Sequence, residues 1–333
     1  MKHWSKIQET AGNGFALNLF FLIYNTLHLK YIFLILRPIM FFYYCFSPAQ
    51  RSVSAAFFKH IARYNPAVKP SPKTVYRHFY SFSLSLVERI AAWKQDIKVS
   101  DLIIKNREVY QEIITNLKQK KGCFFLCSHL GNIDLLRALA IQENKDGVHN
   151  TKVNIIIDTT MSPKFNAFMR SIQQQFDINL INSRTIGIET AVLLQQKLDD
   201  GEIVVVAGDR TPSEHSQRIV PVSFLGDTIA LPYGAFLLPV ILKAPLYYFF
   251  ALRENDAFVP KYDFFLYKSS AIMAKKKKDE TIRALMHEYI ELLERKVLEY
   301  PLQWYNFFDI WETGKAFADK KNLTETTNQV KGE

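Results

Sequence analysis

The stretch that decides the fold is Cys123-Phe124-Phe125-Leu126-Cys127-Ser128-His129-Leu130-Gly131-Asn132-Ile133-Asp134. Its first five residues form a short apolar run, which is typical of a strand buried on both faces of a parallel sheet. The run stops at Ser128-His129, and apolar residues at helical spacing follow from Ile133 onward, so we expect a helix there. His129 would then lie at the carboxyl end of a strand, where open α/β sheets bind their ligands.

Asp134 follows His129 by five residues and falls in the first turn of the expected helix, where a negative charge is favourable. From there its carboxylate could reach back to the imidazole. A histidine held by a carboxylate is a general base with a fixed tautomer. A plainer interpretation is a satisfied histidine at a strand end, with an aspartate placed for the helix dipole. The spacing alone leaves both interpretations open.

The composition narrows the class of partner. The chain has 333 residues, of which 48% are hydrophobic and 14% aromatic, and its formal net charge is +10. A positive charge of this size indicates an anionic partner, such as nucleic acid, anionic lipid headgroups or an acidic carrier protein. No nucleic-acid-binding motif is present, and the apolar N-terminal region argues against that partner. Three cysteines suggest a reducing compartment without a disulfide framework.

Residues 15–46 are mostly apolar and aromatic, with interruptions that include Lys30, Arg37 and Pro38. No run reaches the roughly 20 residues of a standard transmembrane helix. Two half-inserted helices or one tilted span fit this pattern, and a buried helix pair in a soluble protein is the alternative. The aromatic excess favours membrane contact. We therefore expect a membrane-associating segment over 1–48, a main domain over 49–312 and a polar, disordered tail over 313–333.

Strands and helices alternate after about residue 97. The expected strands lie near 123–127, 153–158, 178–181 and 202–209, and the helices between them near 106–121, 162–176 and 185–198. This order predicts a mostly parallel central sheet flanked by helices, in the α/β class. Two further strands, near 245–252 and 258–266, can pair with each other. Nucleotide-binding glycine motifs are absent.

The segment from His129 to Asp134 resembles the HxxxxD box of the lysophospholipid acyltransferase superfamily. Other segments of that family follow in the same order and strengthen the resemblance: Phe165-Asn166, Arg170, Gly208-Asp209-Arg210, Ser223-Phe224-Leu225-Gly226, Pro232-Tyr233-Gly234 and the segment 301–308. The chain looks like the bacterial branch that contains the lipid A late acyltransferases. The resemblance implies a glycerol-3-phosphate acyltransferase-like fold, with the acyltransferase domain over 49–312.

The resemblance also implies an activity. A fatty acyl group would pass from acyl carrier protein or coenzyme A, a thioester co-substrate rather than a bound cofactor, to a hydroxyl or amine of a lipid acceptor. The reaction would take place at the cytoplasmic side of the bacterial inner membrane. His129 would deprotonate the acceptor, and Asp134 would orient His129 and stabilise the imidazolium. No metal is implied.

Further site residues are expected from the same resemblance. Arg170 and Asp209 match an arginine and an acid of the lipid A branch, and Arg184 competes with Arg170 for the arginine role. Arg210 is an anion-binding candidate, and Asn132 of the box is counted with the substrate-binding residues. A basic rim of Arg137, Lys164, Arg210 and Arg218 would favour the acidic carrier protein as donor.

Three rival interpretations remain. Cys127 lies two residues before His129, so a Cys-His thioester enzyme is conceivable, although a buried core cysteine is the commoner case. His129 and Asp134 could be metal ligands, but no third ligand has a suitable spacing. A non-catalytic lipid-binding or scaffold protein would keep the apolar segment and the basic surface without needing His129 and Asp134 together.

Overall fold

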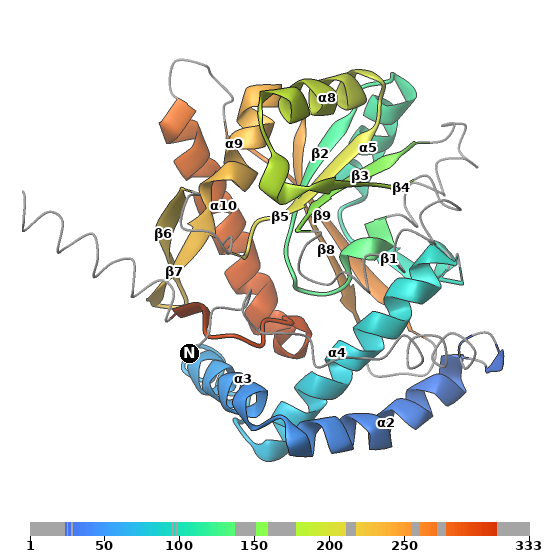
Figure 1. Cartoon of the computed structure of the whole chain (residues 1–333), viewed down its shortest axis with the longest axis vertical. Coiled ribbons are helices and arrows are strands. Elements are labelled where there is room, and N and C mark those ends of the chain that lie inside the picture. Colours follow the sequence, from blue (N-terminus) through green and yellow to red (C-terminus); the bar gives the residue numbers. More distant parts are fainter. Residues whose placement is uncertain are drawn as a thin grey trace, which may run out of the picture.

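The structure is a computed structural model that describes residues 24, 26–27, 29–94, 96–97, 99–136, 151–158, 178–210, 218–254, 260–271 and 278–311. Its centre is a seven-stranded sheet in the order β1-β9-β8-β2-β5-β3-β4, with helices on both faces (Figure 1). The strands are β1 (Leu102–Ile104), β2 (Cys123–Cys127), β3 (Val153–Ile157), β4 (Ile178–Asn182), β5 (Ile203–Ala207), β8 (Leu246–Arg253) and β9 (Tyr262–Lys268). The predicted α/β fold with a mostly parallel central sheet is confirmed.

Strand β2 lies in the middle of this sheet. It pairs in parallel with β5 on one side and with β8 on the other, and only β8 and β9 run antiparallel in the sheet that the structure describes. All five residues of β2 are at most 1% exposed. The short apolar run is therefore the strand covered on both faces that its composition predicts.

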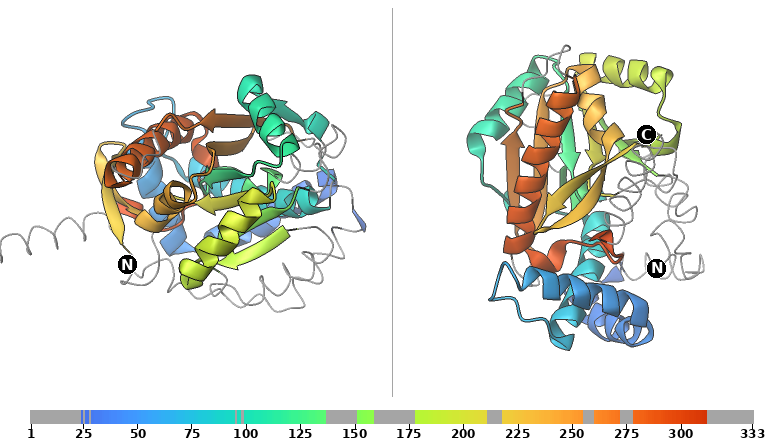
Figure 2. Two further views of the ribbon diagram at one scale, coloured as in Figure 1. Left: turned by 90° about the horizontal axis from the view of Figure 1, so that it is seen from above. Right: turned by 90° about the vertical axis from the view of Figure 1, so that its left-hand side faces the viewer.

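The two faces of β2 pack against different helices (Figure 2). Phe124 and Leu126 join the core beneath α8 (Ile188–Asp199), α9 (Tyr233–Leu242) and α10 (Lys278–Glu299). Cys123, Phe125 and Cys127 point the opposite way, into the core that contains α5 (Arg107–Lys118). This alternation is the two-residue period of a strand, and it gives the protein three layers.

The HxxxxD box that follows β2 does not lead directly into the regular helix that we expected. A short 3-10 turn, η3 (Ile133–Leu135), takes its place, and residues 137–150 lie outside the described residues. The side chain of Asn132 caps this turn, because its Oδ1 accepts a hydrogen bond from the backbone N–H of Asp134 at 3.1 Å. The helix expected over 162–176 also lies outside the described residues.

A separate antiparallel hairpin, β6 (Ile219–Phe224) with β7 (Asp227–Pro232), leads into α9. Three more short turns complete the described elements: η2 (Val99–Asp101), η4 (Ser183–Thr185) and η6 (Pro301–Gln303). The turn η6 belongs to the segment after α10, which returns to the end of β2: Gly131 N–H donates to Gln303 O at 2.9 Å. Residues that are 172 positions apart, 303 minus 131, thus meet at one edge of the sheet.

Helices α2 (Leu29–Phe46), α3 (Pro48–Ile61) and α4 (Pro72–Trp93) lie beyond the carboxyl edge of the sheet (Figure 1). Helix α4 contacts α2, α3, η3 and η6, so it connects the N-terminal helices to the turn that carries the box. Its start is capped by Ser71, whose Oγ accepts from the Thr74 N–H at 3.1 Å, and Pro72 occupies the first turn.

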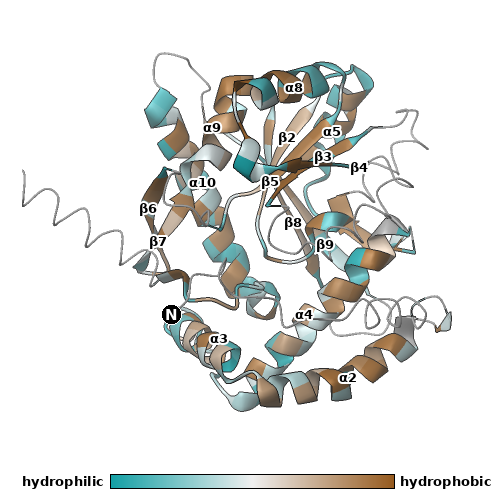
Figure 3. Cartoon of the chain, in the orientation of Figure 1, coloured by the Kyte–Doolittle hydropathy of each residue, from teal (hydrophilic) through white to brown (hydrophobic). Residues whose placement is uncertain are grey.

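Helix α2 is apolar along most of its length (Figure 3). One side buries Phe33 among residues of α4, whereas the other leaves Phe42 63% and Phe46 81% exposed. Among the described residues, no single helix is long and apolar enough to cross a membrane. The bent pair Tyr31–Phe46 and Pro48–Ile61, at 96°, reaches that length and apolarity only when taken together. The division at residue 48 stays a prediction.

Candidate active site

His129 and Asp209 come from neighbouring strands and meet at the carboxyl edge of the sheet. Cys127 at the end of β2 pairs with Ala207 at the end of β5, and the Gly208 N–H donates to Cys127 O at 2.9 Å. This pairing brings the two following side chains together. The Nδ1 atom of His129 lies 2.8 Å from Oδ1 of Asp209.

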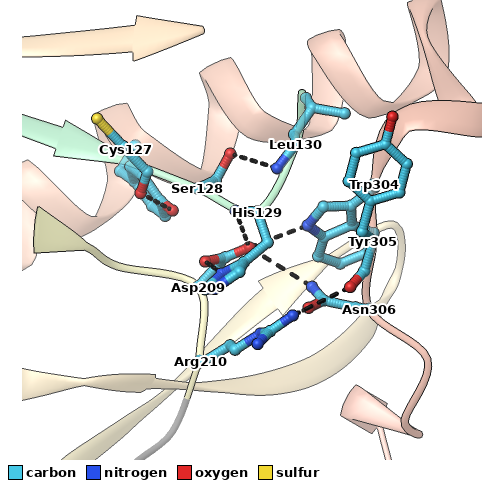
Figure 4. Close-up of polar contacts among 10 residues, drawn as sticks. Cys127, Ser128, His129, Leu130, Asp209, Arg210, Trp304, Tyr305 and Asn306 are labelled. Atoms are coloured by element: carbon cyan, nitrogen blue, oxygen red, sulfur yellow. Dashed lines mark hydrogen bonds and ion pairs between the residues drawn. The ribbon is translucent and has the colours of Figure 1, made fainter. Parts of the chain in front are cut away.

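Four groups hold the Asp209 carboxylate, which is buried (Figure 4). Besides the imidazole at Oδ1, its Oδ2 accepts from the His129 N–H at 2.8 Å, Trp304 Nε1–H at 3.0 Å and Asn306 Nδ2–H at 3.5 Å. Burial opposes ionisation of Asp209, but His129 and Arg210 outweigh it and hold the pKa of this carboxyl well below its usual range. The carboxylate is therefore ionised and acts only as an acceptor.

The ionised carboxylate of Asp209 fixes the tautomer of His129. An ionised carboxylate can only accept, so Nδ1 must carry the hydrogen, and Nε2 of the neutral ring keeps its lone pair. Within the described residues, no hydrogen bond involves Nε2. The side chain of His129 is 32% exposed. The arrangement therefore presents a base of fixed orientation to whatever binds at this edge.

Arg210 follows Asp209 and is fixed by the segment after η6. Its Nε–H donates to Asn306 Oδ1 at 3.1 Å and its Nη2–H to Tyr305 O at 3.0 Å, with the guanidinium 5.7 Å from the centre of the Phe308 ring. Burial lowers the pKa of Arg210 to about 10, so the group remains a cation at neutral pH.

The positive charge of Arg210 affects the pKa of His129. Burial and the charge of Arg210 lower the pKa of His129, whereas the charge of Asp209 and its hydrogen bond raise it, and the net shift is downward. A lowered pKa leaves the imidazole neutral near pH 7, which is the form that can accept a proton.

Asp134 does not occupy the place that we expected for it. The carboxylate on Nδ1 of His129 is Asp209, whereas Oδ2 of Asp134 accepts from Arg89 Nε–H of α4 at 2.5 Å. The physical reason is the conformation of the box: Gly131 adopts a φ of 78°, and the η3 turn follows in place of a regular helix start. A Cβ at Gly131 would lie 2.1 Å from Ala251 O, so glycine is required here.

The remaining predicted site residues are placed as follows. Arg184 follows β4 and its Nε–H donates to Asp158 Oδ2 at 2.9 Å, at the same sheet edge as His129. Strands β5 and β3 lie between β4 and β2, so β4 itself is about 14 Å from β2 by strand spacing, and Arg184 extends from its end toward Asp158 after β3. Asn132 follows His129 in the box after Leu130 and Gly131, and its Oδ1 binds the Asp134 N–H. Arg170, Arg137 and Lys164 lie outside the described residues.

Three residues that we did not expect at the site from the sequence belong to it. Trp304 and Asn306 hold Asp209, and Arg89 pairs with Asp134. The segment 301–308 matched the family, which was a signal for the first two. No motif or spacing pointed to Arg89, since it lies 40 residues before His129, 129 minus 89.

Cys127 is a poor nucleophile in this arrangement. Its thiol is buried in the core beside Cys123 and Phe125, and burial, followed by the charges of Asp209 and Asp134, raises its pKa well above the ordinary value. Across the residues that the structure describes, no group of three His, Cys, Asp or Glu side chains is placed to hold a metal ion.

No curated protein matches the chain. The sequence model of the family described as bacterial lipid A biosynthesis acyltransferase matches residues 71–313, which include α4, the box, Asp209 and the segment after η6. Because this match covers well over half of the 333 residues, the chain belongs to the bacterial lipid A biosynthesis acyltransferase family.

Proposed function

We propose that this protein transfers a fatty acyl group from a thioester, carried by acyl carrier protein or coenzyme A, to a hydroxyl or amine of a membrane lipid. The observation that carries this proposal is the His129–Asp209 pair at the carboxyl edge of the sheet, with Nε2 of the neutral imidazole directed away from the carboxylate. Membership of an acyltransferase family supports the same reaction class.

The reaction needs one base and no covalent enzyme intermediate. Nε2 of His129 takes the proton of the acceptor hydroxyl or amine, while the acceptor oxygen or nitrogen attacks the thioester carbonyl carbon. Asp209 stabilises the imidazolium that forms, because its Oδ1 accepts from Nδ1–H at 2.8 Å. The tetrahedral intermediate then collapses, the C–S bond breaks, and the imidazolium returns the proton to the leaving thiolate.

Charge near the base supports an anionic substrate. The guanidinium of Arg210 donates two hydrogen bonds to the segment after η6, and its positive charge lowers the pKa of His129. We assign Arg210 to substrate binding, and Arg170 and Arg184 stay candidates for the same role. The net charge of +10 suits the acidic carrier protein, anionic lipid or both.

The exposed aromatic side of α2 supports a membrane location. Phe41, Phe42 and Phe46 are more than half exposed on a helix that packs against α4, which in turn contacts the turn η3 of the box. Aromatic rings at such positions favour the interface between lipid and water. We propose that the protein works at the bacterial inner membrane with its active site on the cytoplasmic side.

The test is transfer of a radiolabelled acyl group from acyl carrier protein into lipid extracted from bacterial membranes, with full-length protein in detergent. We expect His129→Ala to lower turnover by about 10²–10⁴-fold, the usual contribution of a general base, with circular dichroism unchanged. The control is Cys127→Ala, which we expect to keep most of the activity. Undiminished transfer by His129→Ala, or a labelled acyl-protein adduct that Cys127→Ala abolishes, would remove the mechanism.

A further inference from the structure

The pair Arg89–Asp134 joins α4 to the turn η3 of the box and has no part in the mechanism above. Asp134 is buried, with 5% of its side chain exposed, and accepts from Arg89 Nε–H at 2.5 Å. The Arg89 side chain is 31% exposed. A buried carboxylate on η3 thus fixes the orientation of a partly exposed cation on α4.

A second observation points to a ligand at this place. The Nδ2 atom of Asn132 is buried and has no hydrogen-bond partner among the described residues. The amide cannot simply be turned over, because its Oδ1 already accepts from Asp134 N–H at 3.1 Å and a flip would oppose two donors. Buried donors are rarely left unsatisfied in folded proteins, so an orphaned donor of this kind calls for a partner other than the residues that the structure describes.

The cation and the orphaned amide belong to one connected unit. Asn132 Oδ1 binds the backbone of Asp134, and the side chain of Asp134 binds Arg89. The unit lies within electrostatic reach of the base, since the charge of Arg89 also lowers the pKa of His129. Guanidinium and amide N–H groups are both donors, and together they match an oxygen of an anionic group.

We propose that Arg89 and Asn132 form a phosphate-binding subsite beside His129, and that Asp134 is the positioning residue that holds both. The proposal rests on the proposed function, in which both substrates can carry phosphate. The thioester donor carries it on its phosphopantetheine arm, and a lipid acceptor carries it in its headgroup. In this arrangement Asp134 acts on substrate binding, whereas Asp209 acts on the base.

The experiment measures binding of inorganic phosphate to full-length protein by isothermal titration calorimetry, and the KM for each substrate. We expect Arg89→Gln and Asn132→Ala to weaken phosphate binding by about tenfold or more, and Asp134→Asn to do the same through Arg89. Arg89→Lys, which keeps the charge, should lose less than Arg89→Gln. Arg63→Gln is the control, because Arg63 is an exposed arginine paired with Asp227 on the hairpin.

The KM values identify the source of the phosphate. A rise in KM for the acyl thioester alone assigns the phosphopantetheine arm, and a rise for the acceptor alone assigns the headgroup, with kcat changing by less than about threefold in either case. Equal phosphate affinity in wild type, Arg89→Gln and Asn132→Ala overturns the proposal. His129→Ala should bind phosphate as tightly as the wild type does. The phosphate-binding measurement therefore tests the subsite even if the proposed acyl-transfer mechanism is wrong.

Discussion

The substitution Asp209→Asn separates the two carboxylates of the site. Oδ2 of Asp209 accepts from His129 N–H and Trp304 Nε1–H at 2.8 and 3.0 Å. An amide in the same place must therefore direct its oxygen to these donors and its NH₂ to Nδ1 of His129. That contact is favourable only if Nδ1 accepts, which moves the ring hydrogen to Nε2 and removes the lone pair that takes the acceptor proton.

The expected loss follows from that change of tautomer. We expect kcat to fall by about 10²–10⁴-fold, or about 3–5 kcal/mol in the activation free energy. The hydrogen bonds to Asp209 also change from charge-assisted to neutral, which should lower the free energy of unfolding by about 2–4 kcal/mol. Asp134→Asn leaves the His129–Asp209 pair in place, so its kcat should stay within about tenfold of wild type.

The assay is acyl transfer at saturating donor and acceptor, together with urea unfolding of each variant. Asp227→Asn is the matched control, because Asp227 lies on the hairpin beside His60 and Arg63 rather than in the site. Near-normal kcat in Asp209→Asn, together with a loss of about 10² or more in Asp134→Asn, would refute the reasoning. The imidazole would then be oriented by the carboxylate of the box.

Three further predictions concern pH and the membrane. Because burial and Arg210 lower the pKa of His129, Arg210→Gln should raise that pKa and move the acid limb of the kcat/KM profile to higher pH. Burial lowers the pKa of His78 from 6.5 to about 4, so on acidification the unfolded state takes up a proton before the folded state does. The free energy of unfolding should therefore fall by about 3 kcal/mol as the pH drops through this range. Urea unfolding at pH 7 and pH 4.5 should show a smaller loss of this free energy in His78→Phe than in the wild type. Replacing Phe42 and Phe46 with Ser should weaken binding to anionic vesicles in flotation assays, with folding unchanged; undiminished flotation would contradict a membrane role for α2.

The central strand and its surroundings could be predicted from the sequence because they depend on local and periodic signals. The five-residue run Cys123–Cys127 is apolar at every position, and a strand with that pattern is stable only when covered on both faces. Alternating strand and helix patterns after residue 97 then fix parallel neighbours and short crossovers. The same rules place His129 and Asp209 at one sheet edge, since each is the second residue after the end of a strand.

The partners of those side chains could not be predicted, because they depend on contacts between distant segments. The box spacing favoured Asp134 as partner of His129, but a left-handed Gly131 and a 3-10 turn direct Asp134 toward α4. The neighbouring registers of β2 and β5 instead bring Asp209 to the imidazole. No local pattern encodes which of two nearby carboxylates reaches a ring nitrogen.

The sequence by itself therefore determined the class of fold, the strand that carries the base, and the family to which the chain belongs. Only the tertiary structure decided that Asp209 orients His129, that Trp304 and Asn306 hold Asp209, and that Asp134 holds Arg89. The physical reason is the distance along the chain over which each signal acts. Hydrophobic periodicity acts over a few residues and survives in any context, whereas hydrogen-bond partners are chosen by atoms within about 3 Å after the chain has packed.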